Sequence, residues 1–190
     1  MAKTADAGEN QSIQTKKRVA DGILKLMEEH PFQEITVTQI CQEAVIARVT
    51  FYRLFETKED VIRFYLHGLL SEFSKKFGPE SDSVKALRIL FDNFPIPVPV
   101  LTMLVEQGLY TVLYSEFQSV IGHFFQKYAI EEMTDQMNRM NSYRINFIAS
   151  TLLNIFMTWV DNGCRESKEE LIEIASRQLQ ISDIKTLTGK

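Results

Sequence analysis

The chain has little cysteine, glycine and proline and no long apolar run, and each shortage excludes a class of protein. Two widely spaced cysteines, Cys41 and Cys164, form neither a disulfide framework nor a zinc cluster. Eight glycines and five prolines in 190 residues exclude a collagen-like or low-complexity chain. No apolar run reaches the roughly 18 residues of a membrane-spanning helix, and the polar start MAKTADAGENQSIQTKKR lacks a signal-peptide core. We therefore expect a globular protein of the reducing cytoplasm, without a membrane partner.

Patterns that support catalysis are missing as well. The sequence has no glycine-rich phosphate loop, no serine elbow, no histidine pair at metal-binding spacing and no cysteine with a nearby base. His123, one of three histidines, lacks the cysteine, histidine or acidic neighbours of a metal site. We therefore expect no enzyme, no cofactor and no metal.

Net charge gives no strong signal for nucleic-acid binding. Residues 1–77 contain 11 basic and 11 acidic residues, and residues 78–190 contain 10 and 14. DNA-binding proteins usually present a basic face, so the placement of charges within the first part of the chain has to decide.

Apolar residues recur at helical spacing along most of the chain, and no segment shows the apolar–polar alternation of a β-strand. Residues 1–12 lack this periodicity and are predicted to be a disordered tail. The expected fold is all-α, with Pro95–Pro99 forming an extended corner. The sequence predicts about nine helices, at 15–30, 36–44, 48–55, 57–77, 83–94, 100–108, 109–128, 133–163 (with a break near Asn141) and 168–180.

Capping signals fix several helix starts. Thr36 with Gln39 and Ser167 with Glu170 have the spacing of capping boxes, and Thr57 precedes acidic residues. Two short helices joined by a three-residue turn, at about 36–55, have the spacing of a helix-turn-helix.

The residues of this region add a closer match. The segments TVTQI at 36–40, RVTFYRLF at 48–55 and KE at 58–59, with Ala44, resemble the TetR-type (tetracycline-repressor) family of bacterial transcriptional regulators. The resemblance implies a DNA-binding domain at 13–73 and a ligand-binding and dimerisation domain at 74–190. FMTW at 156–159, followed by DNG at 161–163, resembles the regulatory half of one subgroup of that family.

Spacing on the second short helix separates an inner face from an outer one. Phe51 and Phe55 lie four apart and are predicted to pack inward. Arg48 on the outer face can pair with a guanine edge, and Val49 can touch a thymine methyl group. The resemblance assigns phosphate contacts to Thr50, Tyr52 and Lys58. The full set of expected DNA contacts is Thr36, Thr38, Arg48, Val49, Thr50, Tyr52, Arg53 and Lys58.

Two residues depart from the family pattern. Val45 stands where the turn commonly has glycine, so a positive φ there would be a strained conformation for a β-branched residue. Ala47 stands where serine or threonine usually caps the recognition helix, which removes about 1 kcal/mol of capping.

The second domain is rich in aromatic residues. Small-molecule pockets are mostly apolar with a few polar anchors, so such residues can line a site for an unknown effector. Ordinary core packing is the alternative for each of them, and the commoner one. The candidate pocket residues are Phe91, Phe94, Tyr110, Tyr114 and His123.

The long helix predicted at 133–163 has two faces to bury. One stripe passes through Ile148 and Ile155, and a neighbouring face contains Phe147, Thr151, Asn154 and Thr158. Together with the last helix, the first stripe suits a four-helix interface across a two-fold axis. The predicted interface is Ile148, Leu152, Ile155, Trp159, Leu171, Ala175 and Leu179.

These observations, together with the resemblance, predict a ligand-responsive regulator that binds a palindromic operator as a homodimer. The resemblance implies repression as the commoner mode, so the expected function is that of a repressor. The alternative is a protein-interaction co-regulator of the same fold with weak or no DNA binding of its own, which Val45 and Ala47 favour.

Overall fold

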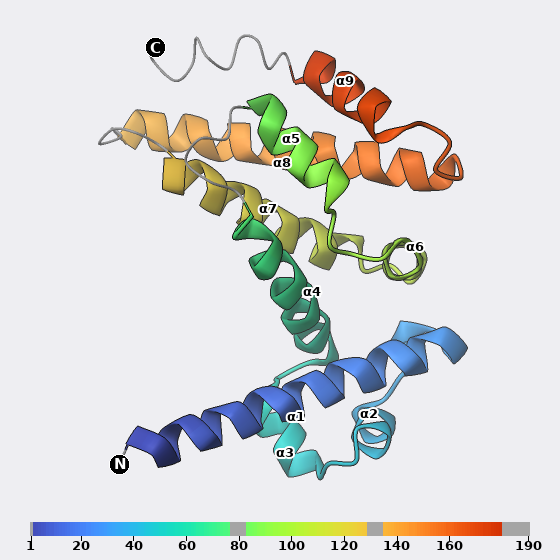
Figure 1. The fold of residues 1–190 in the computed structure, drawn as a ribbon. Coiled ribbons are helices and arrows are strands. Elements are labelled where there is room, and N and C mark those ends of the chain that lie inside the picture. Colours follow the sequence, from blue (N-terminus) through green and yellow to red (C-terminus); the bar gives the residue numbers. More distant parts are fainter. Residues whose placement is uncertain (1, 77–82, 129–134, 180–190) are drawn as a thin grey trace. The chain divides into compact units, whose positions relative to one another are not determined.

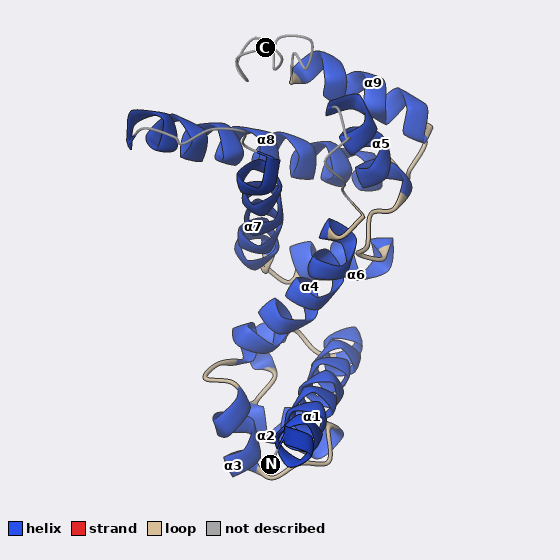
Figure 2. Cartoon of the chain, turned by 60° about the vertical axis from the view of Figure 1, so that its left-hand side comes forward, coloured by secondary structure: helices blue, strands red, loops and turns tan. Residues whose placement is uncertain are grey.

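The computed structural model describes residues 2–76, 83–128 and 135–179. These segments are helical and contain no strand (Figure 2), as the sequence predicts. These segments contain nine α-helices, which carry the same labels in Figure 1. Their bounds are α1 Ala2–Glu29, α2 Val37–Glu43, α3 Arg48–Leu54, α4 Lys58–Ser74, α5 Ser83–Asp92, α6 Val98–Glu106, α7 Tyr110–Tyr128, α8 Asp135–Asp161 and α9 Lys168–Gln178, with a 3-10 turn, η1, at Phe32–Glu34.

The chain divides into two compact units. The first contains residues 1–68 together with 103–112, and the second contains 69–102 and 113–190. The boundaries fall inside α4, α6 and α7. The first unit therefore includes a segment, 103–112, that the sequence assigns to the second domain.

Helices α1, α2 and α3 pack against one another in the first unit. Val19, Ile23 and Met27 form the buried face of α1, as their helical spacing predicts. Gly22 lies where α2 approaches most closely, since a Cβ atom built on it would be 3.4 Å from the backbone nitrogen of Ala44. An exposed ion pair between Lys25 and Glu43, at 2.6 Å, also joins α1 to α2.

The first helix begins much earlier than the sequence predicts. It starts at Ala2, so the expectation of a disordered tail over residues 1–12 is wrong for 2–12. Propagating a formed helix costs far less than starting one, and three alanines in 2–7 favour continuation.

The proline-rich corner is shorter than predicted, because α6 already begins at Val98. Pro99 occupies the first turn of that helix, where the missing N–H has no intrahelical partner to lose. In α8 the break predicted near Asn141 is absent, and the helix is continuous from Asp135 to Asp161.

Aromatic rings form the centre of the second unit. Phe91 and Phe94 stack on Phe156, with ring centroids 4.7 and 4.0 Å apart, and Phe94 also meets the edge of Phe117 at 6.2 Å. Helix α9 packs against both α5 and α8. No helix in the described segments has the length and apolar character needed to cross a membrane.

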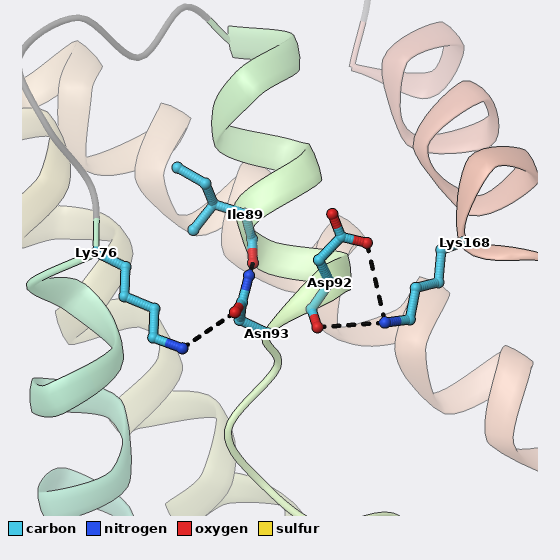
Figure 3. A network of polar contacts seen from close by, with 5 residues as sticks. All are labelled: Lys76, Ile89, Asp92, Asn93 and Lys168. Carbon is cyan, nitrogen blue, oxygen red and sulfur yellow. Dashed lines mark hydrogen bonds and ion pairs between the residues drawn. The ribbon is translucent and has the colours of Figure 1, made fainter.

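Polar contacts hold the end of α5 within the second unit (Figure 3). Lys76 donates to the side chain of Asn93 at 3.1 Å, and Asn93 donates back to the carbonyl of Ile89 at 3.1 Å. On the other side Lys168, the first residue of α9, donates to the carbonyl of Asp92 at 3.2 Å. The Asp92 carbonyl at the helix end is thus satisfied by a residue beyond the helix.

Candidate nucleic-acid interface

Helix α2 is built on the predicted capping box. Thr36 Oγ1 accepts a hydrogen bond from the Gln39 N–H at 3.3 Å, and Gln39 Oε1 accepts one from the Thr36 N–H at 2.8 Å. Ile40 and Cys41 are buried on the inner face of the helix. Burial raises the pKa of the Cys41 thiol, so this cysteine stays protonated and serves as a small apolar side chain.

The turn from α2 to α3 places Val45 at φ 53°. The Val45 N–H bonds the carbonyl of Gln42 at 3.2 Å, and the Ile46 N–H bonds that of Cys41 at 3.0 Å. This pair of hydrogen bonds defines a Schellman motif, which usually places glycine in the left-handed position. The chain therefore forms the ordinary turn and carries the strain anticipated for valine.

Helix α3 is anchored by its inner face. Phe51 and Phe55 are buried, which confirms the inward orientation predicted from their spacing. The ring of Phe55 meets Phe64 of α4 at 5.8 Å between centroids. The ammonium of Lys16 on α1 lies 5.6 Å from both of these ring centroids, a cation–π arrangement that joins the three helices.

The outer face of α3 is open to solvent. Arg48, Val49, Tyr52 and Arg53 are exposed, and Thr50 is half-buried. All but Arg48 line an open surface depression of about 440 Å³. The guanidinium of Arg48 lies 6.0 Å from the ring centroid of Tyr52, one helical turn along. Among the described residues, no acidic side chain forms an ion pair with Arg48 or Arg53, so both charges remain available to an anionic partner.

Lys58 has a different environment from the one expected of a phosphate contact. Its ammonium donates to the carbonyls of Phe32, Gln33 and Ile35 at 2.6, 3.0 and 3.0 Å, and it lies 4.5 Å from the Phe32 ring centroid. An ammonium has three N–H donors, and all three are used. The side chain therefore holds η1 against the start of α4, and the phosphate contact predicted for Lys58 stays a prediction.

The other residues predicted to contact DNA differ in whether their side chains already form hydrogen bonds within the chain. The Thr36 hydroxyl is committed to its capping box, whereas Thr38 is exposed. Ala47 has the extended backbone of an N-cap, φ −76° and ψ 148°, but supplies no side-chain hydrogen bond. Thr57 and Asp60 cap α4 reciprocally, and the hydrogen bond from the Thr57 hydroxyl lowers the pKa of Asp60.

Sequence reasoning missed the role of Gln107, which follows α6. Its side-chain oxygen accepts a hydrogen bond from the Phe32 N–H at 2.7 Å, and its nitrogen donates to the Met27 carbonyl at 2.8 Å. These contacts span 75 and 80 residues of sequence. No local pattern in the sequence could have indicated them.

The predicted pocket residues have separate environments. Phe91 and Phe94 belong to the aromatic core of the second unit. The hydroxyl of Tyr114 donates to the Asn146 carbonyl at 3.4 Å, Tyr110 is half-buried and His123 is exposed. Core packing, the alternative considered for these residues, therefore describes Phe91 and Phe94. In the described segments no group of three or more histidine, cysteine, aspartate or glutamate side chains could hold a metal ion.

The predicted dimer stripe is largely covered by its own chain. Ile148, Leu152, Leu171, Ala175 and Leu179 are buried, because α9 packs on α5 and α8 of the same molecule. Trp159 is half-buried and donates through Nε1 to the Glu166 carbonyl at 3.0 Å, and Ile155 is also half-buried. The assignment of the buried five to a surface between molecules is corrected. Exposed apolar side chains lie instead at Tyr143, Phe147 and Ile174.

Comparisons with known proteins agree with both parts of this fold. Residues 20–63 match the family described as bacterial regulatory proteins, tetR family, and residues 101–180 match a transcriptional regulator C-terminal region. The HTH-type dhaKLM operon transcriptional activator DhaS of Lactococcus lactis subsp. lactis is 30% identical over 86 residues. That match covers 43% of this chain and 46% of the relative, so the chain matches about half the length of this curated protein.

Among solved structures, that of DhaS shows the same fold. A structure of the dihydroxyacetone kinase operon activator DhaS superposes with a TM-score of 0.54 at 19% identity, covering 90% of this chain and 96% of that one. FadR of Thermus thermophilus, described as a TetR family repressor in complex with lauroyl-CoA, gives 0.46 at 18% identity, with coverages of 87% and 93%. With family matches over residues 20–63 and 101–180 and a helix-turn-helix whose outer face is open, the chain belongs to the TetR family of bacterial regulatory proteins.

Proposed function

We propose that the protein is a ligand-responsive repressor that binds a palindromic operator as a homodimer, with α3 in the major groove. The observation that carries the proposal is the outer face of α3, where Arg48 and Arg53 stand without acidic partners among the described residues, beside the exposed Val49 and Tyr52. Base edges are read by such side chains, and phosphates by hydroxyls beside them.

Repression is the simpler mode for a protein of this kind. Occupying promoter DNA blocks transcription without any further contact, whereas activation needs an additional surface for the transcription machinery. The curated relative is named an activator, so a reporter gene behind the selected operator is the direct test. Higher reporter expression after deletion of the regulator supports repression, and lower expression contradicts it.

Operator selection from a pool of random duplexes tests DNA recognition. We expect a palindromic consensus with half-sites about one DNA turn apart, and binding that weakens steeply with salt. Tyr52→Phe keeps the ring that contacts Phe51 at 5.5 Å and removes only the hydroxyl. If that hydroxyl donates to a phosphate, the variant should weaken binding to all duplexes by about the same factor and leave the salt slope unchanged, because a neutral group releases no counterion.

Failure of the selection has a defined meaning. Weak binding without sequence preference, together with capture of a defined partner protein, would favour the co-regulator hypothesis. The strained Val45 and uncapped Ala47 do not decide this question, because both affect how stably α3 is held.

Exposed apolar residues support the homodimer. Tyr143 and Phe147 lie four apart on α8 and are 78% and 56% exposed, and Ile174 on α9 is exposed as well. A second copy placed on these helices would remove such side chains from water, and a two-fold axis then presents two α3 helices. Sedimentation should show a dimer that Phe147→Ser weakens. Val98→Ser, at another exposed apolar residue, is the matched control.

We propose that an unknown small-molecule effector acts through the second unit. Effector and operator must then change each other's affinity by the same factor. Isothermal titration of candidate effectors with and without operator measures that factor. Identical effector affinities in the two titrations would contradict a ligand-responsive regulator.

A further inference from the structure

The turn between α6 and α7 is folded into the same unit as the DNA-binding helices. Residues 103–112 cluster with residues 1–68, and Leu104 and Leu109 of this segment are buried. Both α6 and α7 continue from the segment into the other unit. A short piece of the chain's second half is therefore a structural part of the unit that contains α3.

Gln107 makes polar contacts between this turn and the DNA-binding helices. The Met27 carbonyl belongs to the last turn of α1, and the Phe32 N–H belongs to the first residue of η1. Helix ends leave such groups without intrahelical partners. One side-chain amide satisfies both, accepting from Phe32 at 2.7 Å and donating to Met27 at 2.8 Å.

Lys58 holds η1 from α4 through its three carbonyl contacts. The 3-10 turn is thus fixed by two side chains, one from α4 and one from the α6–α7 turn. Only Ile35 and Thr36 separate η1 from α2, and α3 packs on α2 after the four residues 44–47. A shift of η1 is therefore carried to α2 and then to α3.

We propose that Gln107 is a positioning residue for operator binding, which fixes η1 and through it the placement of α2 and α3. The inference rests on the proposed function, since it assigns Gln107 an effect on α3 as the DNA-reading helix. Under this proposal, the α6–α7 turn acts on the DNA-binding helices at Met27 and Phe32, through the side chain of Gln107.

The test compares Gln107→Ala with Glu106→Ala, an exposed neighbour on the same turn. Operator affinity is measured by fluorescence anisotropy, and hydrogen exchange of residues 32–47 is measured without DNA. Loss of two hydrogen bonds should weaken operator binding about 3- to 10-fold and speed exchange in that segment. Glu106→Ala should change neither quantity. Wild-type affinity in Gln107→Ala overturns the proposal.

Gln107→Glu adds a readout that a generally destabilised protein would not give. A protonated carboxyl can accept from the Phe32 N–H and donate to the Met27 carbonyl, as glutamine does, whereas a carboxylate can only accept. Affinity relative to the wild type should therefore recover as pH falls through the pKa of the new carboxyl. A ratio that does not vary with pH contradicts the proposed geometry.

The two proposals fail in different ways. If the wild type binds no duplex, the proposed function fails, and exchange alone then judges Gln107. Faster exchange confined to Gln107→Ala supports its control of η1 and α2, and unchanged exchange overturns it.

Discussion

The turn between α2 and α3 is strained, and relieving the strain should stabilise the protein. Val45 has φ 53°, and its side chain is 80% exposed. A left-handed conformation costs an L-residue about 1–2 kcal/mol, and branching at Cβ favours the upper end of that range. With most of the side chain in water, packing offsets little of this cost. Two other helix ends with the same hydrogen-bond pattern have glycine, Gly108 at φ 78° and Gly163 at φ 75°.

Val45→Gly should therefore raise the free energy of unfolding of the first unit by about 1 kcal/mol. Removing the strain stabilises the fold by about 1–2 kcal/mol. The greater freedom of glycine in the unfolded chain offsets about 0.5–1 kcal/mol of this gain. Val45→Asn should also stabilise, because asparagine tolerates the left-handed region better than valine does.

Urea unfolding followed by circular dichroism measures the change, with midpoints compared at equal slope. Because the two units can unfold separately, hydrogen exchange of residues 37–54 locates the effect in α2 and α3.

Val49 is the matched control, since it is 76% exposed and lies in helical α3. Val49→Gly should destabilise by a few tenths of a kcal/mol, because glycine is a poorer helix former than valine. Opposite signs for the two substitutions are the expected result. A Val45→Gly variant no more stable than the wild type would refute the strain argument.

Three further predictions concern the same unit. Ala47→Ser should stabilise α3 by about 1 kcal/mol, because Ala47 already has N-cap backbone geometry; an unchanged urea midpoint would contradict this. Lys58→Met should destabilise by about 2 kcal/mol, since three carbonyls lose a charged donor; a loss confined to DNA affinity would contradict this and support a phosphate contact instead. The pKa of Asp60 is lower in the folded protein than in the unfolded chain, so its carboxylate stabilises the fold. This contribution is fully present above the unfolded-state pKa and is lost as pH falls through the folded-state pKa. Thermal unfolding from pH 6 to pH 2 should therefore show a smaller acid loss in Asp60→Asn than in the wild type, and equal losses would count against the assignment.

Features set within a few residues could be predicted from the sequence. The capping boxes of Thr36 and Ser167 are confirmed with both reciprocal hydrogen bonds, because each needs only a residue and its neighbour three positions on. The inward packing of Phe51 and Phe55 is confirmed for a similar reason, since helical spacing alone puts them on one face.

Features that depend on distant segments could not be predicted. Lys58 is engaged by η1, which lies more than 20 residues earlier, and Gln107 reaches back 75 residues or more. On α8 the spacing of apolar residues predicted two faces to be buried, but it could not indicate which of the two packs within the same molecule. Ile148 and Leu152 are buried in the chain's own core, whereas Phe147 is exposed. The DNA contacts, that of Lys58 included, stay predictions, because contact with DNA depends on a partner.

Recognition of DNA by α3 is tested most directly by the ratio of affinities for the selected operator and a scrambled duplex. We expect a wild-type ratio of about 10³ or more. Arg48→Ala should lower the ratio about tenfold or more, since a bidentate base contact discriminates by 1–3 kcal/mol. Arg88→Ala, at an exposed arginine on α5, should leave it unchanged. A wild-type ratio near one, or equal ratios for wild type and Arg48→Ala, would contradict the account.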